Sequence, residues 1–133
     1  MPGSGSLAVM RLPAVALVVL AFLAGGCAPG ISQKDLLAQM QGSSPPLILD
    51  VRTAREFRDG HLAGAVNISI VDDFRNRFER LNPPKDKSIV VICEHGPRAS
   101  FAGFVLKASG YTSVYNLDGA MKAWKANKLP MEK

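Results

Sequence analysis

Short apolar runs alternate with amphipathic segments from residue 32 to the end of the chain. The runs at residues 47–49, 65–68, 88–92 and 112–115 have the length and apolar character of short buried strands. Around them, apolar positions recur every three or four residues, which indicates helices from 32 to near 42, from 53 to 59, and over 72–81, 98–109 and 120–127. Short strands that alternate with helices predict an α/β domain with a small, mostly parallel central sheet.

Local signals refine two of these helices. Thr53 and Glu56 have the spacing of a capping box, so the second helix is expected to begin at Thr53. In the long helix that follows the third strand, we expect Phe101, Phe104 and Val105 to face the core.

The first 26 residues read as a targeting segment rather than as part of the fold. They contain a single charged residue, Arg11, followed by an apolar run at residues 14–24 and then by small residues. The apolar run has eleven residues, whereas a helix needs about 20 to cross the hydrocarbon core of a bilayer. We therefore expect residues 1–26 to be a signal peptide and the protein to be exported.

The end of this segment resembles a bacterial lipoprotein signal, in which a Cys after small residues is lipidated and becomes the mature N-terminus. The resemblance rests on Leu23-Ala24-Gly25-Gly26-Cys27, although Ala24 stands where that family usually has Leu. It implies lipidation of Cys27, a short tether over residues 27–31, a domain over 32–133, and a position in the periplasm at the outer membrane. Ordinary cleavage that leaves a soluble periplasmic protein, or a retained N-terminal anchor, are the alternatives.

Composition narrows the possible classes of protein. The chain has 133 residues, two cysteines and a net charge of +5, and 107 residues remain after the leader, enough for one core. Two cysteines exclude a disulfide-stapled miniprotein and a zinc site made of paired Cys-x-x-Cys motifs, and we expect no metal. The excess of positive charge is modest, and aromatic residues are not interleaved with the basic residues on one surface. Nucleic-acid binding is therefore not expected.

The candidate chemistry lies in a loop between the third strand and the long helix. Its residues are Cys93, Glu94, His95, Gly96, Pro97 and Arg98. Ligands of open α/β sheets gather where strands end and helices begin, and such a loop directs successive backbone N–H groups inward. The helix N-terminus adds free donors and about half a positive charge. The sequence therefore predicts an anion cradle with a sulfur atom at its base.

A thiol at a helix N-terminus or near a cation ionises more readily, so we expect Cys93 to be largely thiolate at neutral pH. Glu94 opposes this ionisation unless its side chain points to solvent, and His95 either donates to an incoming anion or rims the pocket. An isolated Cys after an apolar strand is usually a small buried hydrophobe. Gly96, Pro97 and Arg98 at this spacing favour the reactive thiol instead.

Four pieces of the sequence carry a further signal. They are Asp50-Val51-Arg52 with Glu56-Phe57, the run from Gly60-His61-Leu62-Ala63-Gly64 to Ile68, the loop from Cys93 to Arg98, and the stretch from Gly110-Tyr111 through Asn116-Leu117-Asp118-Gly119 to Trp124. In this order they resemble a single-domain rhodanese, a member of a sulfurtransferase family. The resemblance covers residues 32–130. It implies a three-layer rhodanese-like domain whose helices flank a mostly parallel sheet.

The resemblance also implies an activity. Cys93 would take sulfane sulfur from a small anionic donor such as thiosulfate, hold it as a persulfide, and pass it to cyanide or a thiol. The backbone amides of Glu94 to Arg98 would cradle the persulfide, and Arg98 would bind the donor or the departing sulfite. No cofactor is expected besides the covalent persulfide on Cys93. The protein is expected to be a monomer.

Other residues that match the family are assigned to the scaffold. Asp50 and Arg52 are expected to form local ion pairs at a strand end, and Glu56 to complete a helix cap, with His61 also structural. Ala120 departs from the family pattern because it replaces the second Gly of a common pair. By the family's topology it would lie near the pocket rim and narrow the access of acceptors.

Two rival functions remain open. A dual-specificity-type phosphatase uses a similar loop, but that loop is one residue longer, whereas here four residues separate Cys93 from Arg98. A binding or redox module would present a thiol or persulfide to a partner without steady turnover. Loss of the loop cysteine would favour a purely binding role, whereas Cys93 is present in this chain.

Overall fold

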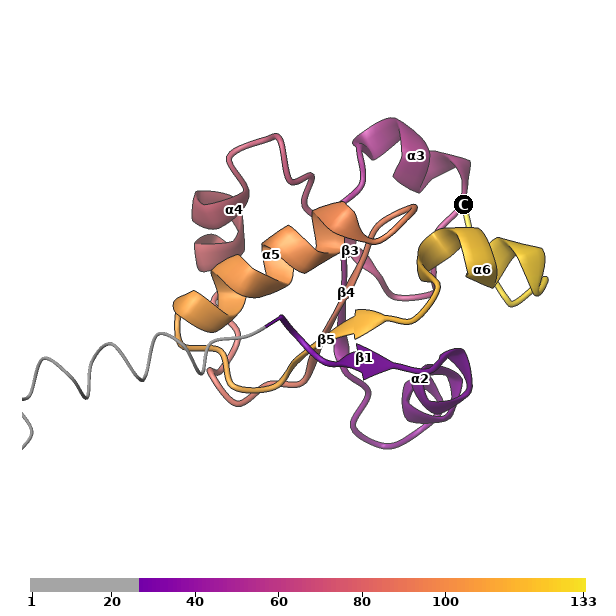
Figure 1. Cartoon of the computed structure of the whole chain (residues 1–133), viewed down its shortest axis with the longest axis horizontal. Coiled ribbons are helices and arrows are strands. Elements are labelled where there is room, and N and C mark those ends of the chain that lie inside the picture. Colours follow the sequence, from indigo (N-terminus) through magenta and orange to yellow (C-terminus); the bar gives the residue numbers. More distant parts are fainter. Residues whose placement is uncertain (1–26) are drawn as a thin grey trace, which may run out of the picture.

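The computed structural model describes residues 27–133, so the predicted signal peptide lies outside the described residues. Five parallel strands form one sheet in the order β1-β5-β4-β2-β3 (Figure 1). The strands are β1 (Gly30–Ile31), β2 (Leu47–Asp50), β3 (Val66–Asn67), β4 (Ile89–Ile92) and β5 (Val114–Leu117). The most buried strand is β4, which lies between β2 and β5, and none of its four residues is exposed.

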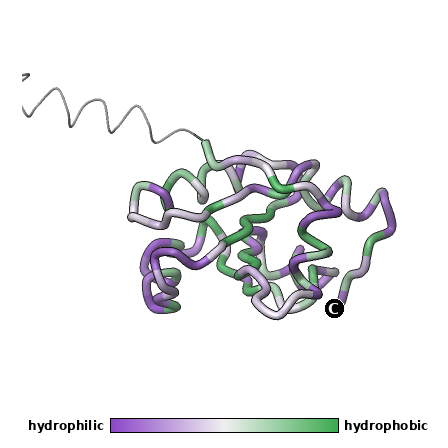
Figure 2. The backbone as a smooth tube through the Cα atoms, turned by 90° about the horizontal axis from the view of Figure 1, so that it is seen from below, coloured by the Kyte–Doolittle hydropathy of each residue, from purple (hydrophilic) through white to green (hydrophobic). Residues whose placement is uncertain are grey.

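Helices cover both faces of this sheet. They are α2 (Gln33–Met40), α3 (Ala54–Asp59), α4 (Phe74–Leu81), α5 (Pro97–Ala108) and α6 (Ala120–Ala126). Helices α4 and α5 share one apolar cluster with the sheet, and α2 and α6 share a second cluster on the other side. The short α3 follows β2 at the edge where the parallel strands end (Figure 1). Segments of hydrophobic residues lie mainly inside the domain, and segments of hydrophilic residues lie at its periphery (Figure 2).

The predicted helix starts are confirmed where the sequence contains a cap. The Ser32 hydroxyl accepts from the Asp35 N–H at the start of α2. At the start of α3, Thr53 and Glu56 form both hydrogen bonds of the capping box. Side chains that satisfy free N–H groups fix a helix start locally, which explains why these boundaries can be read from the sequence.

The inner face of α5 was predicted wrongly. Phe101 and Phe104 are 60% and 54% exposed, and Val105 is only partly buried. The face that meets the sheet carries small residues and one leucine, namely Ala99, Ala102, Gly103 and Leu106. The backbone comes close there, since a Cβ added at Gly103 would lie 3.3 Å from the Cβ of Ala28. Large phenylalanine rings would not fit at such a short approach, so they lie on the outside.

The segment expected to be a tether is partly folded. Gly30 and Ile31 pair in parallel with Asn116 and Leu117 of β5, and Ala28 is buried in the core. A strand of two residues shows no periodicity, which is why the sequence did not reveal β1. Within residues 27–133, no helix has both the length and the apolar character needed to cross a membrane.

Candidate active site

Cys93 comes directly after β4 and is 1% exposed. The loop of Glu94, His95 and Gly96 leads from it into α5, which begins at Pro97. The buried strand therefore carries the sulfur to the carboxyl edge of the sheet, and α5 directs its N-terminus toward the same loop. This is the place that the sequence predicted for Cys93.

The loop turns back on the sulfur. The Gly96 N–H donates to Cys93 Sγ over 3.0 Å, and Gly96 has a φ of +115°, which a side chain would resist. A Cβ at Gly96 would meet nothing within 4 Å, so the glycine is needed for its backbone conformation and not for space. The Ser100 N–H donates to the Gly96 carbonyl over 2.9 Å and joins the loop to the first turn of α5.

The last helix holds the outside of the loop. The N–H groups of Met121 and Lys122, in the first turn of α6, donate to the carbonyl oxygens of Cys93 and Glu94, each over 3.0 Å. The first N–H groups of a helix have no acceptor within the helix, and here two carbonyl groups of the loop accept hydrogen bonds from two of them. Sequence reasoning missed this contact because it joins backbone atoms of segments that lie far apart in the chain.

Ala120 starts α6 in an unusual backbone conformation. Its φ is +56°, a left-handed value that costs a residue with a side chain about 1–2 kcal/mol. Gly119 before it also has a positive φ, of +76°, so the turn into α6 needs two left-handed residues in succession. This need explains why a second glycine is common at this position in the family that the sequence resembles.

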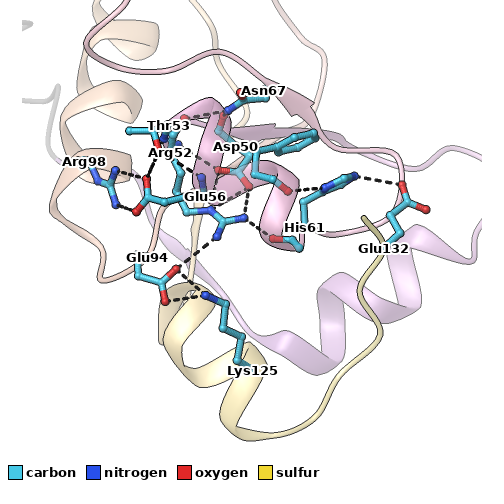
Figure 3. Close-up of polar contacts among 12 residues, drawn as sticks. Asp50, Arg52, Thr53, Glu56, His61, Asn67, Glu94, Arg98, Lys125 and Glu132 are labelled. Atoms are coloured by element: carbon cyan, nitrogen blue, oxygen red, sulfur yellow. Dashed lines mark hydrogen bonds and ion pairs between the residues drawn. The ribbon is translucent and has the colours of Figure 1, made fainter.

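Glu94 is directed toward α6 (Figure 3). Its carboxylate accepts two hydrogen bonds of 2.9 Å from Lys125 Nζ and one of 3.3 Å from Arg52 Nη1. Burial would raise the pKa of Glu94, but the hydrogen bonds and charge of Lys125 and the charge of Arg52 outweigh it and hold the pKa below the ordinary value. Two cations thus neutralise the carboxylate that was expected to oppose ionisation of Cys93.

Arg52 also belongs to a buried ion pair, which it forms with Asp50. Both side chains are 1% exposed, and Arg52 Nη2 lies 2.8 Å from Asp50 Oδ2 and 2.7 Å from the Gly60 carbonyl oxygen. Burial alone would lower the pKa of Arg52, but the hydrogen bonds and charge of Asp50 raise it above the ordinary value. The predicted local ion pair is confirmed, and Arg52 connects it to Glu94.

Arg98 does not stand free over the loop. Its two terminal nitrogens donate to the two carboxylate oxygens of Glu56, each over 2.9 Å (Figure 3). This pairing joins the first turn of α5 to α3. The sequence showed only the capping role of Glu56, since nothing in it relates residues that are 42 positions apart.

The two histidines occupy different settings. His95 is exposed in the loop. His61 stacks on the Phe57 ring at 3.7 Å, its Nδ1 lies 2.8 Å from the Phe57 carbonyl oxygen, and its backbone pairs with Glu132. These contacts are those of a scaffold residue.

Cys27 is the first described residue and is an exposed free thiol. Ala28, the next residue, packs against α5. The candidate lipid attachment point therefore lies on the side of the sheet that carries α4 and α5.

The whole arrangement suits a nucleophilic sulfur that binds a further sulfur atom. A buried thiol is approached by a loop N–H, the helix N-terminus of α5 adds partial positive charge, and the acidic side chains nearby are paired with bases. A negative charge that moves from one sulfur atom to the next would stay inside this cradle.

Known proteins share this architecture. Residues 32–127 match a family described as the rhodanese-like domain. The thiosulfate sulfurtransferase GlpE of Shewanella oneidensis is 32% identical over 88 residues, which are 66% of this chain and 84% of the relative. The uncharacterised protein YqhL of Bacillus subtilis is 34% identical over 77 residues, which are 58% of this chain and 59% of the relative, less than two thirds of its length.

The fold is also that of solved structures. A rhodanese-related protein from Thermoplasma volcanium is similar with a TM-score of 0.68 and 27% identity, over 78% of this chain and 97% of that one. The α/β class and the flanked parallel sheet expected from the sequence are thereby confirmed.

Proposed function

The chain belongs to the rhodanese-like domain family, and from this premise we propose that it is a sulfurtransferase that moves sulfane sulfur through a persulfide on Cys93. The proposal rests above all on the Cys93 thiol, which lies at the base of the loop and accepts the Gly96 N–H. The similarity to the thiosulfate sulfurtransferase GlpE of Shewanella oneidensis supports thiosulfate as the type of donor.

In the first half-reaction the Cys93 thiolate attacks the outer sulfur of thiosulfate. A new S–S bond forms on Cys93, the S–S bond of the donor breaks, and its electron pair leaves with sulfite. The three negative charges of thiolate and thiosulfate become one on the persulfide and two on sulfite. Backbone N–H groups from Glu94 to Arg98 would stabilise the charge on the terminal persulfide sulfur.

In the second half-reaction a thiophilic acceptor attacks that terminal sulfur. With cyanide the products are thiocyanate and the Cys93 thiolate, so the enzyme returns to its starting state without an external oxidant or reductant. A thiolate acceptor would react in the same way, and the products would be an organic persulfide and the Cys93 thiolate. The reaction needs no metal and no cofactor besides the covalent sulfur.

Mass spectrometry of the purified full chain after thiosulfate treatment tests this proposal. We expect one added sulfur atom on the wild type, its disappearance after cyanide, and no adduct on Cys93→Ser. The Cys27→Ser variant is the control for uptake by the other, exposed thiol, and this variant should still take up the sulfur. A wild-type protein that takes up no sulfur would refute the mechanism.

Two further assays, of thiocyanate production and of aryl-phosphate hydrolysis, separate the two rival functions. A module that only presents a thiol would take up sulfur but would show no steady production of thiocyanate. A phosphatase would hydrolyse aryl phosphates in a Cys93-dependent way, although the four-residue spacing between Cys93 and Arg98 favours a single sulfur atom over a phosphoryl group.

We further propose that the protein is exported and anchored to the outer membrane through a lipid on Cys27. The support is the leader sequence, together with the exposure of Cys27. Cells that express the full chain and receive a fatty-acid probe should yield labelled protein, and Cys27→Ser should abolish the label. Label that persists in Cys27→Ser would refute the lipid anchor.

A further inference from the structure

The side chain that was expected to bind an anionic donor is already bound to an acid. Glu56 receives both terminal nitrogens of Arg98 in a two-bond, side-by-side geometry. Such paired charge-assisted hydrogen bonds are the strongest that Arg makes with a carboxylate. A donor that needed the full positive charge of Arg98 would first have to displace Glu56.

Glu56 is itself fixed in place. Its Oε2 accepts from the Thr53 N–H over 2.8 Å and from the Thr53 hydroxyl over 3.0 Å, in addition to its bond from Arg98. The hydrogen bond from Arg98 is the main cause that lowers the pKa of Glu56 to about 2. Glu56 is therefore a rigid anion on α3 at any pH at which the domain would work.

The other charges around the loop are balanced in the same way. Asp50 is paired with Arg52, and Glu94 with both Arg52 and Lys125. These three acids and three bases, with the Glu56–Arg98 pair included, carry no net charge together. This set of side chains therefore leaves no net positive charge for a donor, while the helix N-terminus with its backbone N–H groups adds about half a charge.

We propose that Glu56 is a specificity-determining residue that makes this site favour sulfane-sulfur donors with one negative charge over donors with two. This inference rests on the proposed persulfide chemistry and names the class of donor for that same site. A thiosulfonate, R–SO2–S⁻, represents the favoured class. The Cys93 thiolate attacks its outer sulfur, the S–S bond breaks, and a sulfinate leaves with the electron pair in place of sulfite.

The test compares two donors that share this chemistry and differ by one charge. The ratio of kcat/KM for thiosulfate to kcat/KM for methanethiosulfonate is measured in the wild type and in Glu56→Gln. Glutamine retains an oxygen for the Thr53 cap and removes the charge. Release of one positive charge several ångströms from the donor should raise the ratio by about five- to tenfold.

Two controls isolate the cause. Glu79→Gln, an exposed residue on α4, removes the same charge outside the loop and should leave the ratio as in the wild type. Adding Arg98→Gln to Glu56→Gln should return the ratio toward the wild-type value, because the released charge is then gone. A ratio that is unchanged or falls in Glu56→Gln would overturn the proposal and show that Glu56 only orients Arg98.

A second measurement needs no variant. If Glu56 neutralises Arg98, added salt should reduce wild-type kcat/KM for both donors by similar factors. A much steeper loss for thiosulfate would mean that Arg98 acts as a free charge, which contradicts the inference. Sulfur uptake by Cys93 from methanethiosulfonate, seen by mass spectrometry, shows separately whether the persulfide chemistry itself exists.

Discussion

Two arginine–carboxylate pairs lie near the same loop and differ in how water reaches them. The Arg52–Asp50 pair has both side chains 1% exposed, whereas the Arg98–Glu56 pair is 34% and 33% exposed. Both are short, and each uses two arginine nitrogens. This difference in solvent access predicts separate roles: breaking the buried pair should destabilise the fold, whereas changing the one-third-exposed pair should mainly alter the chemistry of the site.

The largest expected effect comes from breaking the buried pair. Arg52→Met leaves the Asp50 carboxylate buried without its partner and removes a donor to the Gly60 carbonyl, so we expect a loss of about 3–5 kcal/mol in the free energy of unfolding. At the other pair, Arg98→Gln should cost less than about 1 kcal/mol, because water can solvate the carboxylate that it leaves behind. Urea unfolding followed by circular dichroism measures both.

A double variant sharpens this prediction. Asp50→Asn combined with Arg52→Met no longer buries a lone charge, so it should be more stable than Arg52→Met alone. Equal costs for Arg52→Met and Arg98→Gln would contradict the distinction between the two pairs.

A smaller effect should appear on acidification. The pKa of Glu56 is lowered from 4.5 to about 2, chiefly by the hydrogen bond from Arg98. A lowered pKa in the folded state means stabilisation that is complete above about pH 4.5 and is lost as the pH falls toward 2. Because the pair is one-third exposed, we expect this contribution to be only about 1 kcal/mol.

Urea midpoints measured at a series of pH values from neutral to acidic test this expectation. The wild type should lose more stability over the acidic range than Glu56→Gln, which has no carboxyl to protonate at that position. Parallel pH curves for the two proteins would show that Glu56 contributes nothing to acid stability.

Much of the site could be predicted because its signals are local in sequence. The cradle follows from six consecutive residues after an apolar strand, and the cap of α3 from Thr53 and Glu56 at a fixed spacing. Both depend on backbone geometry within one turn, so a single segment contains the information. The alternation of strands and helices along residues 47–127 was predicted for the same reason.

The missed features all depend on how distant segments approach each other. The outward position of Phe101 and Phe104 follows from the close approach of Gly103 to Ala28, and the pairing of Arg98 with Glu56 follows from the place of α3 over the strand ends. Residues 30–31 form strand β1 because they pair with β5, which is far away in the sequence. Neither periodicity nor spacing within one segment encodes such contacts.

The two hydrogen bonds from the start of α6 to the carbonyls of Cys93 and Glu94 have a consequence for the order of synthesis. The loop emerges from the ribosome well before Met121 and Lys122, so for that interval two of its carbonyl groups lack the donors that hold them in the finished domain. The Cys93 sulfur therefore gains its final setting only when almost the whole chain is in place.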